Sequence, residues 1–311
     1  MGEKLVRRIK MMLWEANNIL ITSHKRPDGD AIGSILGLGL ALREVGKEVQ
    51  MVLVDGVPNT FKHLEGSERI TKRIKGGYDT SVVLDCSDLL RVGPVFENGA
   101  LPNINIDHHV TNLNFAQINF VDQNVPATAE ILAELIPSLG LTISKPTADA
   151  LLTGILTDTL GFRTLNIHPR TLRVAANLME LGGNLPFLYQ KALNNHSYES
   201  IQYWSTGLAT LSKDDRLVWA SLTIEDRKTI GYPGRDDADL INVLASIEGF
   251  DIAMVFVEQP NETVKISWRA QKGYDVSQIA RNFGGGGHKP AAGAEIKGDL
   301  DFVKSEVLNL T

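Results

Sequence analysis

Cysteine is nearly absent from this sequence, because Cys86 is the only one among 311 residues. A single cysteine cannot form an internal disulfide, and no group of thiolates is available to hold zinc or an iron–sulfur cluster. We therefore expect any bound metal to be held by histidine and carboxylate side chains.

Long hydrophobic runs are also missing. No stretch approaches the roughly 18 consecutive apolar residues that a membrane-spanning helix needs. The first ten residues, MGEKLVRRIK, have neither the apolar core nor the small-residue cleavage site of a signal peptide. These absences predict a cytoplasmic protein with no membrane partner.

An excess of positive charge is the third missing feature. The 31 lysine and arginine residues are outnumbered by 37 aspartate and glutamate residues, which gives a formal net charge of -6. Proteins that grip long duplexes usually neutralise many phosphates with a broad basic surface. The charge therefore disfavours a long duplex as partner. It still permits short RNA or small nucleotides, which a few local cations and backbone donors can hold.

What the sequence does contain is an alternation of β-rich and helical patterns, which predicts a mostly parallel sheet with flanking helices. Strands are predicted at residues 19–23, 49–54, 81–85 and 104–106, with an edge strand at 117–121. Helices are predicted at residues 3–16, 31–45, 128–139, 146–156 and 169–181. Gly46, Gly140 and Gly182 follow three of these helices, where a left-handed residue often ends a helix.

The chain is long enough for two domains with separate cores. We predict a catalytic α/β domain at residues 1–188, a connector at 189–212 and a smaller α+β domain at 213–311. The second domain is predicted to contain strands at 217–224, 252–258 and 263–269, and helices at 236–248, 275–282 and 301–308. A run of four glycines, Gly284 to Gly287, precedes the last helix.

Histidine and aspartate residues follow several of the predicted strands. They lie in four separate segments: His24, Asp28 and Asp30; Asp85; Asp107, His108 and His109; and Asp158. The first three segments follow strands, whose carboxyl ends form the ligand-binding edge of an open α/β sheet. Taken alone, the first segment is equally consistent with a polar loop in which Asp30 caps the next helix. Four such segments together predict one shared site.

The residue types in these segments favour a site for two divalent cations. Carboxylate oxygens prefer hard cations, and imidazole nitrogens shift the preference from Mg²⁺ toward Mn²⁺. Two cations about 3.5 to 4 Å apart can activate a water molecule and stabilise an in-line displacement at phosphorus. The pattern therefore predicts a phosphoesterase.

These ordered residues resemble a known family. His24…Asp28-x-Asp30, Asp85, Asp107-His108-His109 and Asp158 are similar to the four motifs of the DHH phosphoesterase superfamily. The C-terminal segment GGGGHKPAAG, residues 284–293, resembles the signature of the DHHA1 accessory domain. The resemblance extends from residue 24 to residue 293 and so covers almost the whole chain.

The resemblance implies a role for each motif residue. The implied metal ligands form two sets that share Asp85: His24, Asp28 and Asp85 in the first, and Asp30, Asp85, His108 and Asp158 in the second. Asp107 would orient its neighbours, and His109 would lie near the phosphate or the leaving group as a proton donor.

The second domain is implied to bind the substrate. Gly284, Gly285, Gly286 and Gly287 would let backbone N–H groups approach an anion, and His288 would add a donor or stack on a base. Arg269 resembles the substrate arginine of the family and would hold a phosphate. A flexible glycine loop and a surface ion pair of Arg269 are the alternatives. Catalysis is expected in the cleft between the two domains.

Relatives of this length that join DHH directly to DHHA1 are oligoribonucleases that also act as phosphatases on 3'-phosphoadenosine 5'-phosphate (PAP). The resemblance thus implies hydrolysis of RNA of about two to five nucleotides and of PAP. Hydrolysis of cyclic or linear dinucleotides is the alternative. Single-strand DNA exonuclease, exopolyphosphatase and inactive nucleotide-binding functions are less favoured. A homodimer, the cleavage polarity and a phosphate contact from Arg163 are left open.

Overall fold

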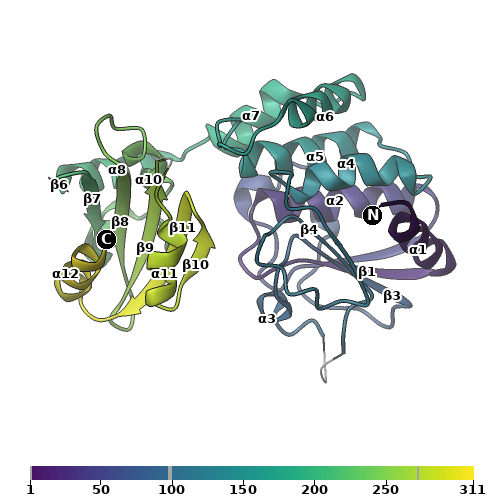
Figure 1. Cartoon of the computed structure of the whole chain (residues 1–311), viewed down its shortest axis with the longest axis horizontal. Coiled ribbons are helices and arrows are strands. Elements are labelled where there is room, and N and C mark those ends of the chain that lie inside the picture. The colour runs from purple at the N-terminus through teal and green to yellow at the C-terminus, as the bar shows by residue number, and fades with distance from the viewer. Residues whose placement is uncertain (1, 97–99, 272) are drawn as a thin grey trace. The chain divides into compact units, whose positions relative to one another are not determined.

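The computed structural model describes residues 2–96, 100–271 and 273–311. It divides into two compact units, Met1–Asn195 and His196–Thr311 (Figure 1). The segment 189–212, predicted as a connector, contains the end of one helix, α7 (Leu185–Leu193), and all of another, α8 (Tyr198–Ala209). The change from one unit to the other therefore falls in the short stretch between these two helices.

The first unit contains a five-stranded parallel sheet in the order β2-β1-β3-β4-β5. Its strands are β1 (Asn18–Thr22), β2 (Glu48–Val52), β3 (Thr80–Leu84), β4 (Ile104–Asp107) and β5 (Ile118–Val121). Buried aliphatic side chains occupy β1, β3 and β4, as expected for parallel strands that are covered on both faces. The predicted α/β fold with a parallel sheet is confirmed.

Helices cover this sheet. They are α1 (Gly2–Glu15), α2 (Gly29–Glu44), α3 (Leu89–Val92), α4 (Thr128–Ser138), α5 (Lys145–Asp158), α6 (Pro169–Glu180) and α7, with short 3-10 turns η1 (Asn59–Phe61) and η2 (Ser67–Arg69). Figure 1 shows α2, α4 and α5 stacked beside the sheet, with α6 and α7 outside them. Gly46, Gly140 and Gly182 have φ of 84°, 82° and 100°, which confirms the predicted left-handed helix ends.

Glycine allows α2 and α5 to pack unusually closely. A Cβ atom on Gly33 would collide with the carbonyl oxygen of Ala150 on α5. On α5, a Cβ atom on Gly154 would lie 2.6 Å from Ala129 Cβ and 2.8 Å from Asp30 Oδ1. Real Cβ atoms do not approach other atoms so closely, so both positions require glycine. This contact brings Asp30, near the start of α2, to the last turn of α5.

The second unit contains a six-stranded mixed sheet in the order β10-β11-β9-β8-β7-β6. The strands are β6 (Ser212–Asp214), β7 (Leu217–Leu222), β8 (Ile252–Gln259), β9 (Thr263–Ala270), β10 (Gly286–His288) and β11 (Ala291–Lys297). Besides α8, its helices are α9 (Ile224–Ile230), α10 (Leu240–Leu244), α11 (Val276–Asn282) and α12 (Leu300–Leu310). Helices α11 and α12 cover one face of the sheet, and α8 and α10 pack on the other. The predicted smaller α+β domain is confirmed.

One prediction for this unit was wrong, and the alternative interpretation of the glycine run also differs from the structure. The helix predicted at 236–248 is only α10, because Ala238 and Asp239 adopt left-handed backbone angles, with φ of 51° and 68°, just before it. The glycine run is not simply a flexible loop, because Gly286 and Gly287 form strand β10 with His288. Strands β6, β10 and β11 and helices α7, α8 and α9 were not predicted.

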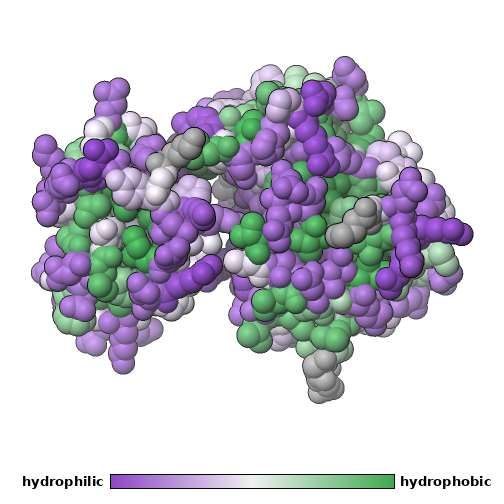
Figure 2. All heavy atoms as spheres, in the orientation of Figure 1, coloured by the Kyte–Doolittle hydropathy of each residue, from purple (hydrophilic) through white to green (hydrophobic). Residues whose placement is uncertain are grey.

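On the face seen in Figure 2, both units carry many hydrophilic residues, with apolar ones among them. Across the described parts of the chain, every helix is too short or too polar to cross a lipid bilayer.

Candidate active site

The fold brings the four predicted segments to one place in the first unit. His24 follows β1, Asp85 follows β3, and His108 and His109 follow β4. These strands are neighbours in the order β1-β3-β4, so their carboxyl ends lie together. Asp158 is the last residue of α5. The fourth segment therefore reaches the site from a helix.

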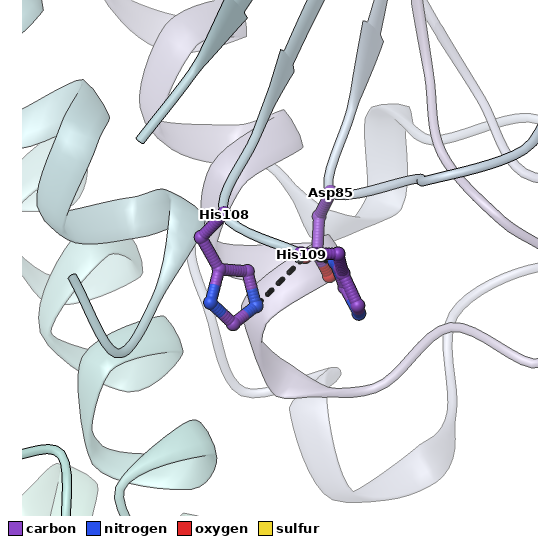
Figure 3. A group of neighbouring side chains, drawn as sticks. All are labelled: Asp85, His108 and His109. Atoms are coloured by element: carbon purple, nitrogen blue, oxygen red, sulfur yellow. Dashed lines mark ion pairs between the residues drawn. The ribbon is translucent and has the colours of Figure 1, made fainter. Parts of the chain in front are cut away.

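The ligand atoms of these residues form three overlapping groups, in each of which all atoms lie within 4.8 Å of one another: His24, Asp28 and Asp85; Asp30, His108 and Asp158; and Asp85, His108 and His109. Figure 3 shows Asp85 and His108 at the ends of neighbouring strands, with His109 beside Asp85. Nitrogen and oxygen donors in this number and arrangement fit divalent cations.

Asp85 lies between the two ligand sets. Its Oδ2 is 3.5 Å from His24 Nε2, and its Oδ1 is 3.6 Å from His108 Nε2. Asp85 is buried and has a φ of 52°, a left-handed conformation that is uncommon for residues other than glycine and costs energy. This conformation turns the carboxylate out of the strand direction. One oxygen therefore faces each set, as a bridging ligand requires.

His24 and His108 are held in the same way. Nδ1 of His24 donates to the carbonyl of Lys25 at 2.9 Å, and Nδ1 of His108 donates to the carbonyl of Val125 at 3.4 Å. A carbonyl can only accept, so the Nδ1 atoms carry protons and Nε2 is the atom directed toward the carboxylates. Metal-binding histidines are commonly oriented by this kind of backbone contact.

Asp107 belongs to none of the three groups of ligand atoms and instead contacts His109, a member of the third. Asp107 is fully buried, and its Oδ1 accepts a hydrogen bond from His109 Nδ1 at 2.7 Å. Its Oδ2 accepts from Asn112 Nδ2 at 2.6 Å, and Asn112 also donates to Asn105 Oδ1 at 2.8 Å. The sequence reasoning missed Asn105 and Asn112. A polar residue inside an apolar strand was the available signal for Asn105.

Two of the carboxylates also cap helices. Asp28 Oδ1 accepts from the backbone nitrogen of Ala31 at 3.0 Å and so caps α2. Asp30 does not cap α2, which corrects the alternative interpretation of this segment. Its two oxygens accept from the backbone nitrogens of Thr128 and Ala129, at 2.6 and 2.9 Å, in the first turn of α4. The positive ends of two helices therefore lie beside the acidic residues and reduce their mutual repulsion.

The crowding of carboxylates changes their pKa values. Burial and the neighbouring acids Asp85 and Asp28 raise the pKa of Asp30 and Asp158 well above the usual value. Burial acts in the same direction on Asp85, but His24 and the other histidines outweigh it and lower its pKa. Burial lowers the pKa of His24, but Asp28 and Asp85 outweigh burial and raise the pKa above its usual value, to about 10. Without cations this cluster therefore favours bound protons, and bound cations would replace them.

In the second unit, the sheet register places Arg269 and His288 on one face. His288 pairs with Ala291, and Ala291 pairs with Arg269 on β9, so the three side chains form a row across neighbouring strands. The next row along this face consists of Gly286, Gly293 and Ser267. Small residues thus cover the sheet between the two larger side chains.

Arg269 is held in place by neutral groups. Its Nε donates to Asn242 Oδ1 at 3.2 Å, and its Nη1 donates to the carbonyl of Trp268 at 3.0 Å. Burial lowers the pKa of Arg269, although Asp237 and Asp239 act in the opposite direction. No ion pair of Arg269 occurs within residues 2–96, 100–271 and 273–311, so the alternative of a surface ion pair was wrong.

The four glycines of the run have different surroundings. A Cβ atom on Gly285 or Gly287 would collide with the backbone oxygen of Gly293 or Ala291. Gly284 has a φ of 72°. Gly286 has neither constraint, because no described atom lies within 4 Å of its Cβ position. Packing and backbone angles thus explain three of the glycines, and open space surrounds the fourth.

Comparison with known proteins matches one family model to part of each unit. The model of the DHH family N-terminal domain matches residues 18–155, and the DHHA1 domain matches residues 214–309. The bifunctional oligoribonuclease and PAP phosphatase NrnA of Thermus thermophilus is 38% identical over 297 residues, covering 93% of this chain and 88% of the relative. This chain belongs to the DHH family of phosphoesterases.

A more distant match is the cyclic-di-AMP phosphodiesterase PdeA of Listeria monocytogenes. It is 24% identical, and the match covers 96% of this chain but 47% of PdeA. Among solved structures, an exopolyphosphatase-related protein from Bacteroides fragilis has a TM-score of 0.91 at 26% identity, covering 99% of this chain and 94% of that chain. A known structure thus has the same fold over nearly the whole of this chain.

Proposed function

We propose that this protein is a metal-dependent phosphoesterase that hydrolyses short oligoribonucleotides to mononucleotides and PAP to AMP. The observation that carries the proposal is the 38% identity to an oligoribonuclease and PAP phosphatase over 93% of the chain. The three overlapping groups of ligand atoms around Asp85 support the same chemistry. The cytoplasmic location expected from the sequence is part of this proposal.

Two divalent cations, Mn²⁺ in preference to Mg²⁺, would be held by the two sets that share Asp85. His24, Asp28 and Asp85 would hold one, and Asp30, Asp85, His108 and Asp158 the other. When bound, such cations lower the pKa of water and neutralise charge that develops on phosphate oxygens. The mixture of imidazole and carboxylate ligands supports the preference for manganese.

His109 would hold the proton that the leaving group needs. Asp107 accepts from its Nδ1 at 2.7 Å and fixes the orientation of the ring. Burial lowers the pKa of His109, but Asp107 and Asp85 more than compensate and raise it to about 9. The buried Asp107–Asn112 contact in turn prevents the carboxylate from rotating toward the ligand sets.

The second unit would hold the rest of the substrate. Arg269 would bind a phosphate group through its guanidinium, which Asn242 orients. His288 would contact the same substrate two strands away, with Ala291 between them. The open space at Gly286 supports a close approach of the substrate to the backbone of β10.

A second candidate function is hydrolysis of cyclic or linear dinucleotides. It is supported by the match of PdeA to 96% of this chain. The lower identity, 24% against 38%, makes it the less favoured of the two. Both functions would use the same ligand sets and differ in the substrate.

A product assay with Mn²⁺ separates the candidates. The panel contains 5'-labelled RNA dimer to pentamer, PAP, cyclic di-AMP, a longer single-stranded DNA and polyphosphate. Faster turnover of short RNA and PAP supports the first function, and faster turnover of cyclic di-AMP supports the second. The Asp85→Asn variant is the control and should be inactive on every substrate. Preference for long DNA or polyphosphate would contradict both candidates.

A further inference from the structure

Thr128 contacts two of the proposed metal ligands, Asp30 and Asp85. It is the first residue of α4 and is completely buried. Its hydroxyl donates to Asp85 Oδ1 at 3.1 Å, while its backbone nitrogen donates to Asp30 Oδ2 at 2.6 Å. One residue outside all the sequence motifs therefore contacts both carboxylates.

The two contacts of Thr128 differ in what they require. Any residue other than proline supplies the backbone N–H that Asp30 accepts. Only a side chain with a hydroxyl on Cβ, that of threonine or serine, supplies the contact to Asp85. The choice of threonine over valine, which has nearly the same shape, is thus explained by Asp85 and not by the capping of α4.

The hydroxyl acts on the Asp85 oxygen that faces the second ligand set. Asp85 Oδ1 lies near His108 Nε2, at 3.6 Å, whereas Oδ2 lies near His24. A carboxylate oxygen has two lone pairs, so Oδ1 can accept from Thr128 and still bind a cation. The hydrogen bond limits rotation of the carboxylate about its Cβ–Cγ bond. It therefore keeps one oxygen turned toward each set.

We propose that Thr128 is a positioning residue that holds Asp85 in the orientation needed to bridge two cations. This inference rests on the proposed function, because it assumes that the two ligand sets bind metal. Residues that orient metal ligands typically change metal affinity by roughly tenfold to a hundredfold when they are replaced. The effect of losing the Thr128 hydroxyl should fall in that range for the second ligand set.

The test compares Thr128→Val with Thr128→Ser in the full-length chain. Mn²⁺ binding is measured by calorimetric titration, and coupling between two bound Mn²⁺ ions is measured by electron paramagnetic resonance. Thr128→Val should weaken one Mn²⁺ site by roughly tenfold or more and reduce the spin-coupled signal. Thr128→Ser should restore both, because it keeps the hydroxyl. Thermal unfolding in EDTA controls for a general loss of stability.

Each outcome decides between positioning and a structural role. Equal Mn²⁺ affinity and coupling in Thr128→Val and the unmodified protein would overturn the proposal. Equal losses in Thr128→Ser and Thr128→Val would also overturn it, since the shape of threonine would then matter and not its hydroxyl. If Thr128→Val does not fold, Thr128→Ala is compared with Thr128→Ser in its place. Failure of the unmodified protein to bind two Mn²⁺ ions would instead contradict the proposed function.

Discussion

Asp30 Oδ2 lies 2.6 Å from the backbone nitrogen of Thr128, so a carboxylate near the start of α2 caps the first turn of α4. Ala127, the residue before α4, has no side-chain oxygen that could cap it. Asp30 therefore stabilises the helical layer of the first unit and belongs to a ligand set at the same time. Its two roles can be separated by comparison with Asp158, which caps no helix among the described residues.

We expect Asp30→Ala and Asp158→Ala both to weaken Mn²⁺ binding, but only Asp30→Ala to destabilise the metal-free protein. Loss of a helix cap typically costs about 1 to 2 kcal/mol. Removing either carboxylate relieves repulsion from Asp28 and Asp85, so the two variants differ only in the helix cap. Urea unfolding in EDTA measures the difference. A metal-free stability of Asp30→Ala equal to that of the unmodified protein would contradict the capping role.

Gly154→Ala should damage the site although it replaces no proposed ligand. Its new Cβ atom would lie 2.8 Å from Asp30 Oδ1 and 2.6 Å from Ala129 Cβ, so Asp30 or α4 must shift. Overpacking of this kind typically costs about 1 to 3 kcal/mol. We expect lower stability and weaker Mn²⁺ binding. Gly77→Ala is the matched control, because its Cβ would meet no described atom within 4 Å.

Gly286→Ala should impair substrate binding, whereas Gly287→Ala should impair the stability of the second unit. Gly287 has a φ of 146° and packs against the backbone of β11, so alanine there should lower the stability of the second unit. Alanine at Gly286 fits the fold, and we expect it to raise KM for PAP and short RNA while stability is unchanged. Thermal unfolding and steady-state kinetics measured together test this. An unchanged KM in Gly286→Ala would argue against substrate contact with β10.

Asp107→Asn should lower kcat more than it lowers Mn²⁺ affinity. An amide accepts the hydrogen bond from Nδ1 of His109 less strongly than a carboxylate does. His109 would therefore lose its fixed orientation. Loss of a general acid typically costs about 10²- to 10⁴-fold in rate. Kinetics with PAP at saturating Mn²⁺, combined with calorimetric titration, separate the two effects. A variant that loses Mn²⁺ binding and activity in parallel would show that Asp107 serves the ligand sets instead.

Removing metal should affect the first unit and leave the second unchanged. A cation present at 100 times its dissociation constant stabilises the folded form by about 2.7 kcal/mol. The proposed ligands all lie within Met1–Asn195. Hydrogen exchange should therefore become faster in EDTA at the ends of β1, β3 and β4 and in the first turn of α4. Equal acceleration in β8 and β9 would contradict this assignment.

The elements that position the site were readable from the sequence, because they are local and strongly apolar. Strands β1, β3 and β4 are continuous buried runs, and the polar residues directly after them stand out. Helix α8 was missed because the polar residues after Asn194 suggested a connector. One of them, Ser197, is in fact the residue that caps the helix, since its Oγ accepts from Ser200 N.

Other features depend on contacts between distant parts of the chain. Strands β10 and β11 were missed because glycine and alanine give no alternating pattern, and their pairing with β9 is a tertiary contact. Thr128 and Asn112 look ordinary in the sequence, and only the fold brings them to Asp85 and Asp107. The ligands and Asp107 can be recognised by motif, whereas Thr128 and Asn112 cannot.

Strand β10 also bears on how this protein behaves at high concentration. It is an exposed edge strand, and edge strands can pair with a second chain and start aggregation. β10 is only three residues long, and two of these are glycine, which makes it a poor template for another strand. The glycines of β10, one of which leaves open space beside the strand, therefore also protect the sheet from edge-to-edge association.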